Sequence, residues 1–527
     1  MSMSFRGRLL AATVCAGVLG AAAAPAGAET LADAVALAYQ NNPTLEAQRA
    51  VQRALDETYV QARSGWRPTL NANASMTYNQ TRIPKAAGGA PIDVNGDGIP
   101  DILQHGIFES NSARIGLTFT QPLWTGGRVA AAVNAANYDV LAGQENLRRV
   151  EAQVLTSVIQ VYSDVRRDQE ALAIQRTNVE VLTRQLQESQ ARFDVGELTR
   201  TDVAQSQARL AQGQSLLQSA IAQLAISRAS YATLVGQNPG DLAPQPSLAY
   251  LLPKDVDEAY KLAEEFNPQL RAQQFAEQAS RARVAGARAE RMPNVSGQVT
   301  YGFNGPAIPN RPLDPFQSDL YNRGVTATLS ASVPLFNGGL TSSRIRQAIE
   351  RNNTDRINIE AVRRTTLQSI TQFWSQLIAA RSNISSSDEQ VRASRIASEG
   401  THQEQQVGLR TTIDVLNAEQ ELRSAELSAI TSRRDEYVAA ANVLATTGRL
   451  EAKDLIPAVK PYDATKNFRR LRLTWGWVPW EEPISKIDQY ATPFPSRTPE
   501  AKPQEAPIGP GLEPPPAVVA PPATVKH

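Results

Sequence analysis

A long helical segment that turns and comes back occurs twice in this chain. The first copy runs from Gly126 to Val235 with a turn at Val195-Gly196, and the second runs from Gly338 to Thr447 with a turn at Val407-Gly408. At about 1.5 Å per residue, the outgoing arm Gly126–Arg192 is roughly 100 Å long, about three times the thickness of a bilayer core. A rod of this length must join a bundle or span a space.

Composition excludes several classes of protein. The chain has 527 residues, too many for one ordinary core. Its 53 basic and 52 acidic residues leave no positive excess for nucleic acid. Residues 1–28 have the pattern of a secretory signal peptide, with two arginines before the apolar stretch Leu9–Ala24. The one cysteine, Cys15, lies in that signal, so disulfides and thiolate metal sites are excluded from the mature chain. A lipoprotein anchored at Cys15 is the alternative.

Four later stretches alternate apolar and polar residues with a period of two. No further run of about 18 apolar residues follows the signal, so a membrane-spanning part would have to consist of strands. Strands of about ten residues with one apolar and one polar face are typical of outer-membrane barrels, and a soluble sandwich is the alternative. The four stretches are Leu70–Asn79, Ala113–Thr120, Val295–Phe303 and Val325–Val333.

Similar corners follow the two strand pairs. Pro122 and Pro334 each precede an aromatic residue and a pair of glycines. Proline ends a strand ladder, and glycines let the chain turn into a helix. The aromatic residues, Trp124 and Phe336, fall where a periplasmic-side aromatic girdle would lie.

Further motifs recur in the same order, so the chain is expected to be an internal duplication. Asn42-Pro43 matches Asn267-Pro268, and Pro68 matches Pro293. A cluster of Trp475, Trp477 and Trp480 follows the repeats and could dock a partner or pack on the chain's own helices. The expected segments are a signal peptide (1–28), a first repeat (29–236), a linker (237–254), a second repeat (255–448), a periplasmic equatorial extension (449–488) and a proline-rich disordered tail (489–527).

Four strands are too few to close a barrel, which needs about eight. Open strand edges in lipid would leave backbone groups unsatisfied, so several chains must contribute. The expected fold is a mixed α and β membrane protein. Each chain would supply four transmembrane β-strands to a twelve-strand trimeric barrel, on a long periplasmic α-helical barrel.

The double repeat, the two corners and the stretch Val407–Ala418 resemble the TolC family of trimeric outer-membrane channel-tunnels. The resemblance covers nearly all of residues 30–460. It implies a homotrimer in the outer membrane of a Gram-negative bacterium, in contact with lipid and with its helices in the periplasm. It also implies a periplasmic adaptor protein and an inner-membrane ABC or proton-driven pump as partners. The family has no catalytic site, and the scattered histidines His105, His402 and His527 suggest none here.

The resemblance further implies a gate at the helix turns. Family residues at the positions of Arg410, Thr201 and Asp202 hold the closed state by bonds between helices. Acidic residues at the positions of Asp414 and Asn417 form rings across the pore, and the asparagine departs from that pattern. A simpler interpretation is that Asp202 and Asp414 only cap their helices, since both match the spacing of a capping box.

The loop between the first two strands contains a pattern that resembles a calcium loop. Oxygen-bearing positions and a glycine have the required spacing, but position twelve is Gln104 rather than a carboxylate. A turn cluster without an ion is the alternative, and no other cofactor is expected. The candidate ligands, including one backbone carbonyl, are Asp93, Asn95, Asp97, Ile99 and Asp101.

The leading function is therefore the exit duct of a tripartite export system. It would pass secreted protein by type I secretion, or small molecules by efflux, and the sequence does not separate these uses. A trimeric cell-surface structural or adhesive protein with a helical stalk is the alternative. That alternative predicts a barrel at one terminus and no mirrored halves, in conflict with the duplication.

Overall fold

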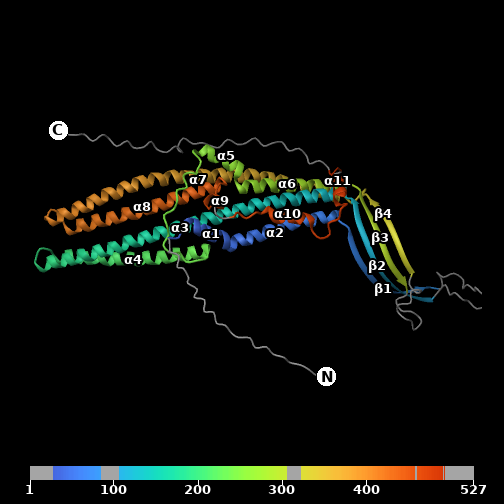
Figure 1. Cartoon of the computed structure of the whole chain (residues 1–527), viewed down its shortest axis with the longest axis horizontal. Coiled ribbons are helices and arrows are strands. Elements are labelled where there is room, and N and C mark those ends of the chain that lie inside the picture. Colours follow the sequence, from blue (N-terminus) through green and yellow to red (C-terminus); the bar gives the residue numbers. More distant parts are fainter. Residues whose placement is uncertain (1–27, 85–105, 306–321, 457–459, 491, 493–527) are drawn as a thin grey trace, which may run out of the picture.

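The computed structural model describes residues 28–84, 106–305, 322–456, 460–490 and 492. A rod of helices carries a sheet at one end (Figure 1). The signal peptide predicted over residues 1–28 lies outside the described residues except for Ala28. The calcium-loop pattern from Asp93 to Asp101 lies wholly outside them, as does most of the predicted tail.

Two units with the same order of elements make up most of the described chain, and three short helices follow them. The first unit contains α1 (Leu31–Asn41), α2 (Pro43–Arg63), the 3-10 turn η1 (Ser64–Trp66), β1 (Thr69–Ile83), β2 (Gly106–Trp124), α3 (Arg128–Asp194) and α4 (Arg200–Val235). The second contains α5 (Val256–Phe266), α6 (Pro268–Ala289), β3 (Asn294–Gly305), β4 (Asn322–Ser332), α7 (Leu340–Gln406) and α8 (Thr412–Thr446). The last elements are α9 (Ala452–Leu455), α10 (Thr465–Arg470), the 3-10 turn η3 (Leu471–Leu473) and α11 (Glu481–Tyr490).

The repeated Asn-Pro pairs make the same joint in both units. Asn42 and Asn267 cap α2 and α6, and the proline after each takes the first helical position, where no backbone donor is needed. Each asparagine also donates a side-chain hydrogen bond to the end of its unit's last long helix. Asn42 bonds Leu234 O at 3.0 Å, and Asn267 bonds Thr446 O at 2.8 Å.

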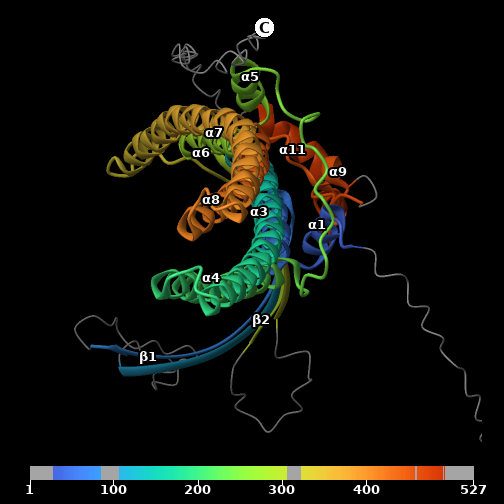
Figure 2. The same ribbon diagram turned by 90° about the vertical axis from the view of Figure 1, so that its left-hand side faces the viewer.

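The long helices α3 and α7 have 67 residues each, close to the predicted bounds. Glycines with positive φ precede them, and others at Gly196 and Gly408 follow them in the turns. Viewed along the rod, the long helices form an arc with α1, α9 and α11 on its convex side (Figure 2). None of the helices in the described part of the chain combines the length and apolar character needed to cross a bilayer.

The main hydrophobic core lies midway along the rod, where the short helix α1 packs on the long helices. Tyr162 of α3 and Tyr231 of α4 are fully buried there, with ring centroids 6.5 Å apart. Burial disfavours the phenolate and is the main reason that the pKa of Tyr162 is raised to about 12. This core fixes the two hairpins to each other far from their free ends.

The sheet is antiparallel in the order β1-β2-β3-β4, and its outer strands have no further partner among the described residues. Residues directly opposite each other share a face, so the register collects the predicted apolar positions on one face. One row across the four strands is Leu70, Phe119, Val299 and Ala327, and the next is Ala72, Leu117, Tyr301 and Val325. The opposite face carries rows of polar residues such as Asn71, Thr118, Thr300 and Thr326.

The helix α11 lies at the corner where the sheet meets the rod (Figure 1), and it continues past the expected boundary at residue 489. Its fully buried Asp488 accepts hydrogen bonds from the backbone N–H groups of Thr125 (2.9 Å), Gly127 (3.0 Å) and Ala130 (3.3 Å). The Trp66 indole donates to the same carboxylate at 3.2 Å. Since Gly127 offers no side chain at the start of α3, Asp488 supplies the cap from a distant part of the chain.

A second buried carboxylate of α11 joins it to the other side of the corner. Glu481 is fully buried and pairs with Arg63 at 2.6 Å and with Arg67 at 2.9 Å. The tryptophan cluster is divided: Trp475 is fully exposed, whereas Trp480 is half-buried and donates to Gln121 at 2.9 Å. The end of the described chain therefore holds the junction of β2 and α3 in place.

Candidate functional site

Both helix turns lie at the end of the rod that is farthest from the sheet (Figure 1). One joins α3 to α4 and the other joins α7 to α8. These turns carry Thr201, Asp202, Arg410, Asp414 and Asn417, the residues predicted to form a gate. We call this end the tip.

Asp202 and Asp414 both cap returning helices. The Thr199 hydroxyl donates to Asp202 Oδ2 at 2.7 Å, and the Thr411 hydroxyl donates to Asp414 Oδ2 at 2.6 Å. Each carboxylate also accepts from the backbone N–H of the same threonine at 3.0 Å. These bonds favour the ionised form, so the pKa of each carboxyl lies below its ordinary value.

Arg410 bonds within its own hairpin in a single chain. Its Nε donates to Glu404 Oε2 at 2.8 Å, and that carboxylate raises the pKa of the guanidinium. The structure places Thr201 and Asp202 on the other hairpin, where Thr201 is exposed. One chain therefore does not bring Arg410 together with these two residues.

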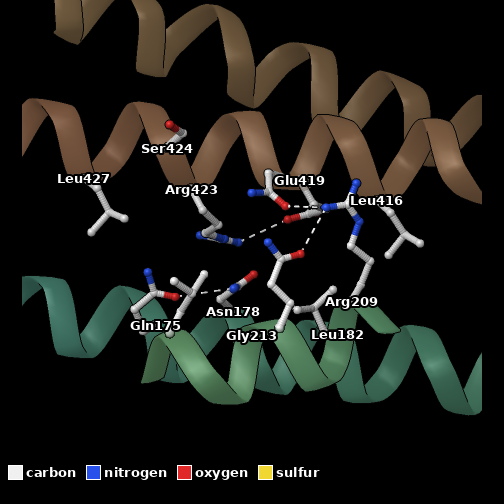
Figure 3. A pocket seen from close by; sticks show the side chains of 13 residues that line it. Gln175, Asn178, Leu182, Arg209, Gly213, Leu416, Glu419, Arg423, Ser424 and Leu427 are labelled. Carbon is white, nitrogen blue, oxygen red and sulfur yellow. Dashed lines mark hydrogen bonds and ion pairs between the residues drawn. The ribbon is translucent and has the colours of Figure 1, made fainter. Parts of the chain in front are cut away.

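A link between the hairpins comes instead from Arg209, which was not singled out in the sequence. From α4 its guanidinium donates to Asn417 Oδ1 at 3.0 Å and to Gln420 Oε1 at 2.9 Å, both on α8. Figure 3 shows this side chain reaching across the gap. The only hint in the sequence is that the second repeat has Glu421 at the matching position, a reversal of charge.

The gap that Arg209 crosses is a small cavity of about 130 Å³ between the hairpins, and both polar side chains and leucines line it. Gln175, Asn178 and Glu419 border it (Figure 3). Gly213 lets α4 approach α3 beside it, because a Cβ there would come within 2.8 Å of Leu182 Cδ1.

The residues predicted as an aromatic girdle occupy unlike surroundings. Trp124 is half-buried at the corner that α11 covers, whereas Phe336 is 91% exposed at the matching corner of the second unit. In the described segments, histidine, cysteine and acidic side chains do not gather into a group of three that could hold a metal ion. The predicted calcium ligands lie outside those segments and stay a prediction.

Comparisons with known proteins agree on one family. Residues 34–237 and 259–449 match the model of a family described as outer membrane efflux protein. The chain is 31% identical over 449 residues to outer membrane efflux protein BepC of Brucella suis, covering 85% of this chain and 91% of that protein. It is 26% identical to the alkaline protease secretion protein AprF of Pseudomonas aeruginosa, over 60% of this chain and 65% of AprF.

A solved structure shares the fold at low sequence identity. The Campylobacter jejuni CmeC outer membrane channel superimposes with a TM-score of 0.68 at 15% identity. The match covers 84% of this chain and 89% of the channel. The arrangement of rod and sheet is therefore one found in outer-membrane channels.

Proposed function

This chain belongs to the outer membrane efflux protein family, and from that membership we propose that three copies of it form one duct. The protein lies in the outer membrane, with its helical part in the periplasm. It serves there as an exit duct for export. The resemblance to the TolC family covers nearly the same residues as the family match and also indicates an export duct in the outer membrane. A cell-surface adhesive role is not favoured.

The four-stranded sheet is the observation that supports assembly of several copies. Its apolar side chains are exposed to solvent in one chain; Leu70, Met76, Val325 and Leu329 are each 66–73% exposed. Burial in lipid would remove this apolar surface from water, while closure would pair the free edges of β1 and β4.

The number of copies follows from the width that a duct needs. Two copies would supply about eight strands, and the interior of such a barrel is filled by side chains. Three copies would supply about twelve and leave a lumen lined by the polar rows. The arcs of helices seen in Figure 2 would then continue the same tube into the periplasm.

The tip is the natural place for a gate, because the hydrogen bonds of Arg209 join the two hairpins there. A periplasmic adaptor and an inner-membrane pump, of the ABC or proton-driven class, would act on this end. The names of BepC and AprF describe an efflux protein and a secretion protein, so both uses stay open for this chain.

The assembly has a direct test in the mass of the mature protein in mild detergent. We expect three chains per particle by native mass spectrometry or light scattering corrected for detergent. The expected mature chain begins at Glu29. A monomer under conditions that keep the helical circular dichroism would contradict the duct.

A second test concerns cations at the tip. If three copies of Asp414 line one constriction, their mutual repulsion favours binding of a multivalent cation. We expect a trivalent cation on the periplasmic side to block single-channel current, and Asp414→Ala to abolish the block. Asn417→Asp should strengthen the block only modestly, because the Arg209 guanidinium 3.0 Å from Asn417 Oδ1 would neutralise the new carboxylate.

The matched control is Glu197→Ala, which removes an exposed carboxylate of the other turn that pairs with Arg192. If the block survives Asp414→Ala but is lost in Glu197→Ala, the cation site lies on the turn between α3 and α4 instead. Helix capping alone predicts no change in block for any of the three variants.

A further inference from the structure

We propose that residues 469–490, the end of the described chain, seat on the periplasmic surface of the outer membrane and bind anionic phospholipid there. We call these residues, which include η3 and α11, the junction segment. It would hold the rod to the membrane beside the sheet, from outside the duct. The inference rests on the membrane-spanning role proposed for the sheet, and it assigns a partner to the part of the chain that follows the repeats.

The junction segment lies at the base of the sheet, on the face that lipid would cover. Arg67, two positions before β1 begins, pairs with Glu481 at 2.9 Å. Trp480 donates a hydrogen bond to Gln121 Oε1 at 2.9 Å. Gln121 follows Phe119 by two positions on β2, and side chains alternate along a strand, so both point to the apolar face. The segment therefore begins where the apolar face of the sheet ends.

A tight turn in the segment directs a tryptophan away from the protein. The Trp477 backbone N–H donates to Thr474 O at 3.1 Å, and Gly476 takes the left-handed φ of 92° that closes the turn. Trp475 in this turn is 100% exposed, and the nearby Leu473 is 73% exposed. Exposed apolar surface of this size is unfavourable in water, whereas tryptophan is enriched at the boundary between lipid and water.

The helix α11 is buried on one side and apolar on the other. Three residues at helical spacing face the corner and are buried: Glu481, Ile484 and Asp488. At about 100° per residue, Pro483, Ile487 and Tyr490 lie together on the opposite side. All three are exposed, Ile487 by 58% and Tyr490 by 94%. An apolar stripe with charged residues beside it is typical of a helix that lies in the membrane interface.

The exposed charges around the segment are mainly basic. Among the described side chains of residues 460–490, five basic and two acidic ones are exposed. The buried Glu481 and Asp488 do not offset them, because arginines and backbone N–H groups of the corner already hold these carboxylates. Basic side chains beside apolar ones favour an anionic lipid surface. The exposed basic residues are Lys460, Lys466, Arg469, Arg470 and Lys486.

The position of α11 favours lipid over a second protein as the partner. Figure 2 shows α11 on the convex side of the arc of long helices, outside the tube that the proposed assembly would enclose. On the sheet, Leu70 lies only three positions after Arg67 and is 66% exposed on the apolar face. A membrane that covers this face reaches the junction segment without a change of side.

The experiment compares three single labels in the full chain with Cys15→Ser, reconstituted in nanodiscs of equal parts phosphatidylcholine and phosphatidylglycerol. Leu473 in the segment, Met76 on the apolar face of β1 and Val195 at the tip have the same exposed fraction, 73%. Each is replaced by cysteine and labelled with a small fluorophore. Quenching is measured with phospholipid that carries a nitroxide near its headgroup and, separately, with aqueous iodide.

We expect lipid quenching of the Leu473→Cys label to exceed that of the Val195→Cys label by at least about fivefold, because the apolar side of an interfacial segment sinks about 5–10 Å into the headgroup boundary. Iodide should give the reverse order. The Met76→Cys label reports whether the sheet itself is in lipid.

The preference for anionic lipid is tested by removing two exposed charges, with Lys466→Ala and Arg470→Ala together in the Leu473→Cys chain. Since basic residues near an anionic surface each add to the attraction, lipid quenching should fall by at least about fivefold. Nanodiscs of phosphatidylcholine alone should have the same effect on the unaltered segment. The matched control is Arg184→Ala with Arg200→Ala, two exposed arginines far along the rod toward the tip, which should leave quenching unchanged.

The outcomes separate this inference from the proposed duct. A Leu473→Cys label that behaves like the Val195→Cys label overturns the membrane contact. A label shielded from both lipid and iodide also overturns it, because a protein surface then covers the segment. Equal lipid quenching with and without phosphatidylglycerol overturns the preference for anionic lipid. If the Met76→Cys label is not quenched by lipid either, the sheet is not in the membrane and the proposed function fails instead.

Discussion

Replacing Asp488 by alanine is expected to destabilise the corner between sheet and rod by about 3 kcal/mol or more. The carboxylate is fully buried and accepts from three backbone N–H groups at the start of α3 and from the Trp66 indole. Without it these donors are left unsatisfied, each at about 1–3 kcal/mol, and the helix dipole loses its anion.

The measurement is thermal unfolding of the detergent-solubilised protein followed by circular dichroism. Asp488→Ala should melt well below the wild type, and Asp488→Asn should fall between them because one acceptor oxygen remains. Glu482→Ala is the matched control, since Glu482 lies exposed on the same helix and should change stability by less than about 0.5 kcal/mol. Equal melting of Asp488→Ala and Glu482→Ala would show that α11 does not support the corner.

The sequence predicts the elements well because their cause is local. Period-two alternation marks the four strands, and the Asn-Pro and Gly-Gly pairs mark the joints. The strands run longer than predicted at the end away from the rod: β1 reaches Ile83 and β2 begins at Gly106. There the alternation fades into polar residues, so the ladder continues by backbone bonding alone.

The contacts of α11 could not be predicted because they join residues far apart in the chain. Asp488 and Trp66 are separated by 422 positions, and nothing in the repeat marks the segment that follows it. The repeat predicts that the start of α7 is capped as the start of α3 is. There the cap is local, because Asn337 Oδ1 accepts a hydrogen bond from the backbone N–H of Thr341. Duplication therefore predicts shared geometry but not which side chain provides it.

The gate residues show the same division between local and distant causes. The capping boxes of Asp202 and Asp414 follow from spacing alone, and the structure contains both. The Arg209 link depends on how α4 meets α8, which is set by the core midway along the rod. Nothing in the neighbouring sequence distinguishes an arginine that bonds to another helix from one that is only solvated.

Replacing Arg209 by alanine is expected to open the tip. Its hydrogen bonds to Asn417 and Gln420 join α4 to α8 across a small cavity. If each partly exposed link contributes about 0.5 kcal/mol, three copies together shift the balance between closed and open states by about tenfold. Single-channel recordings in planar bilayers should show a matching rise in the fraction of time spent at high conductance.

Two variants decide which arginine holds the tip. Arg209→Lys keeps the charge but not the fork that reaches two acceptors, so its open fraction should lie between those of wild type and Arg209→Ala. Arg410→Ala removes only the bond to Glu404 within one hairpin, so it should open the tip less than Arg209→Ala does. The reverse order, with Arg410→Ala opening the channel and Arg209→Ala silent, would mean that the lock lies between copies. In that case Arg410 must leave Glu404 in the assembled duct and reach Asp202 of a neighbouring copy.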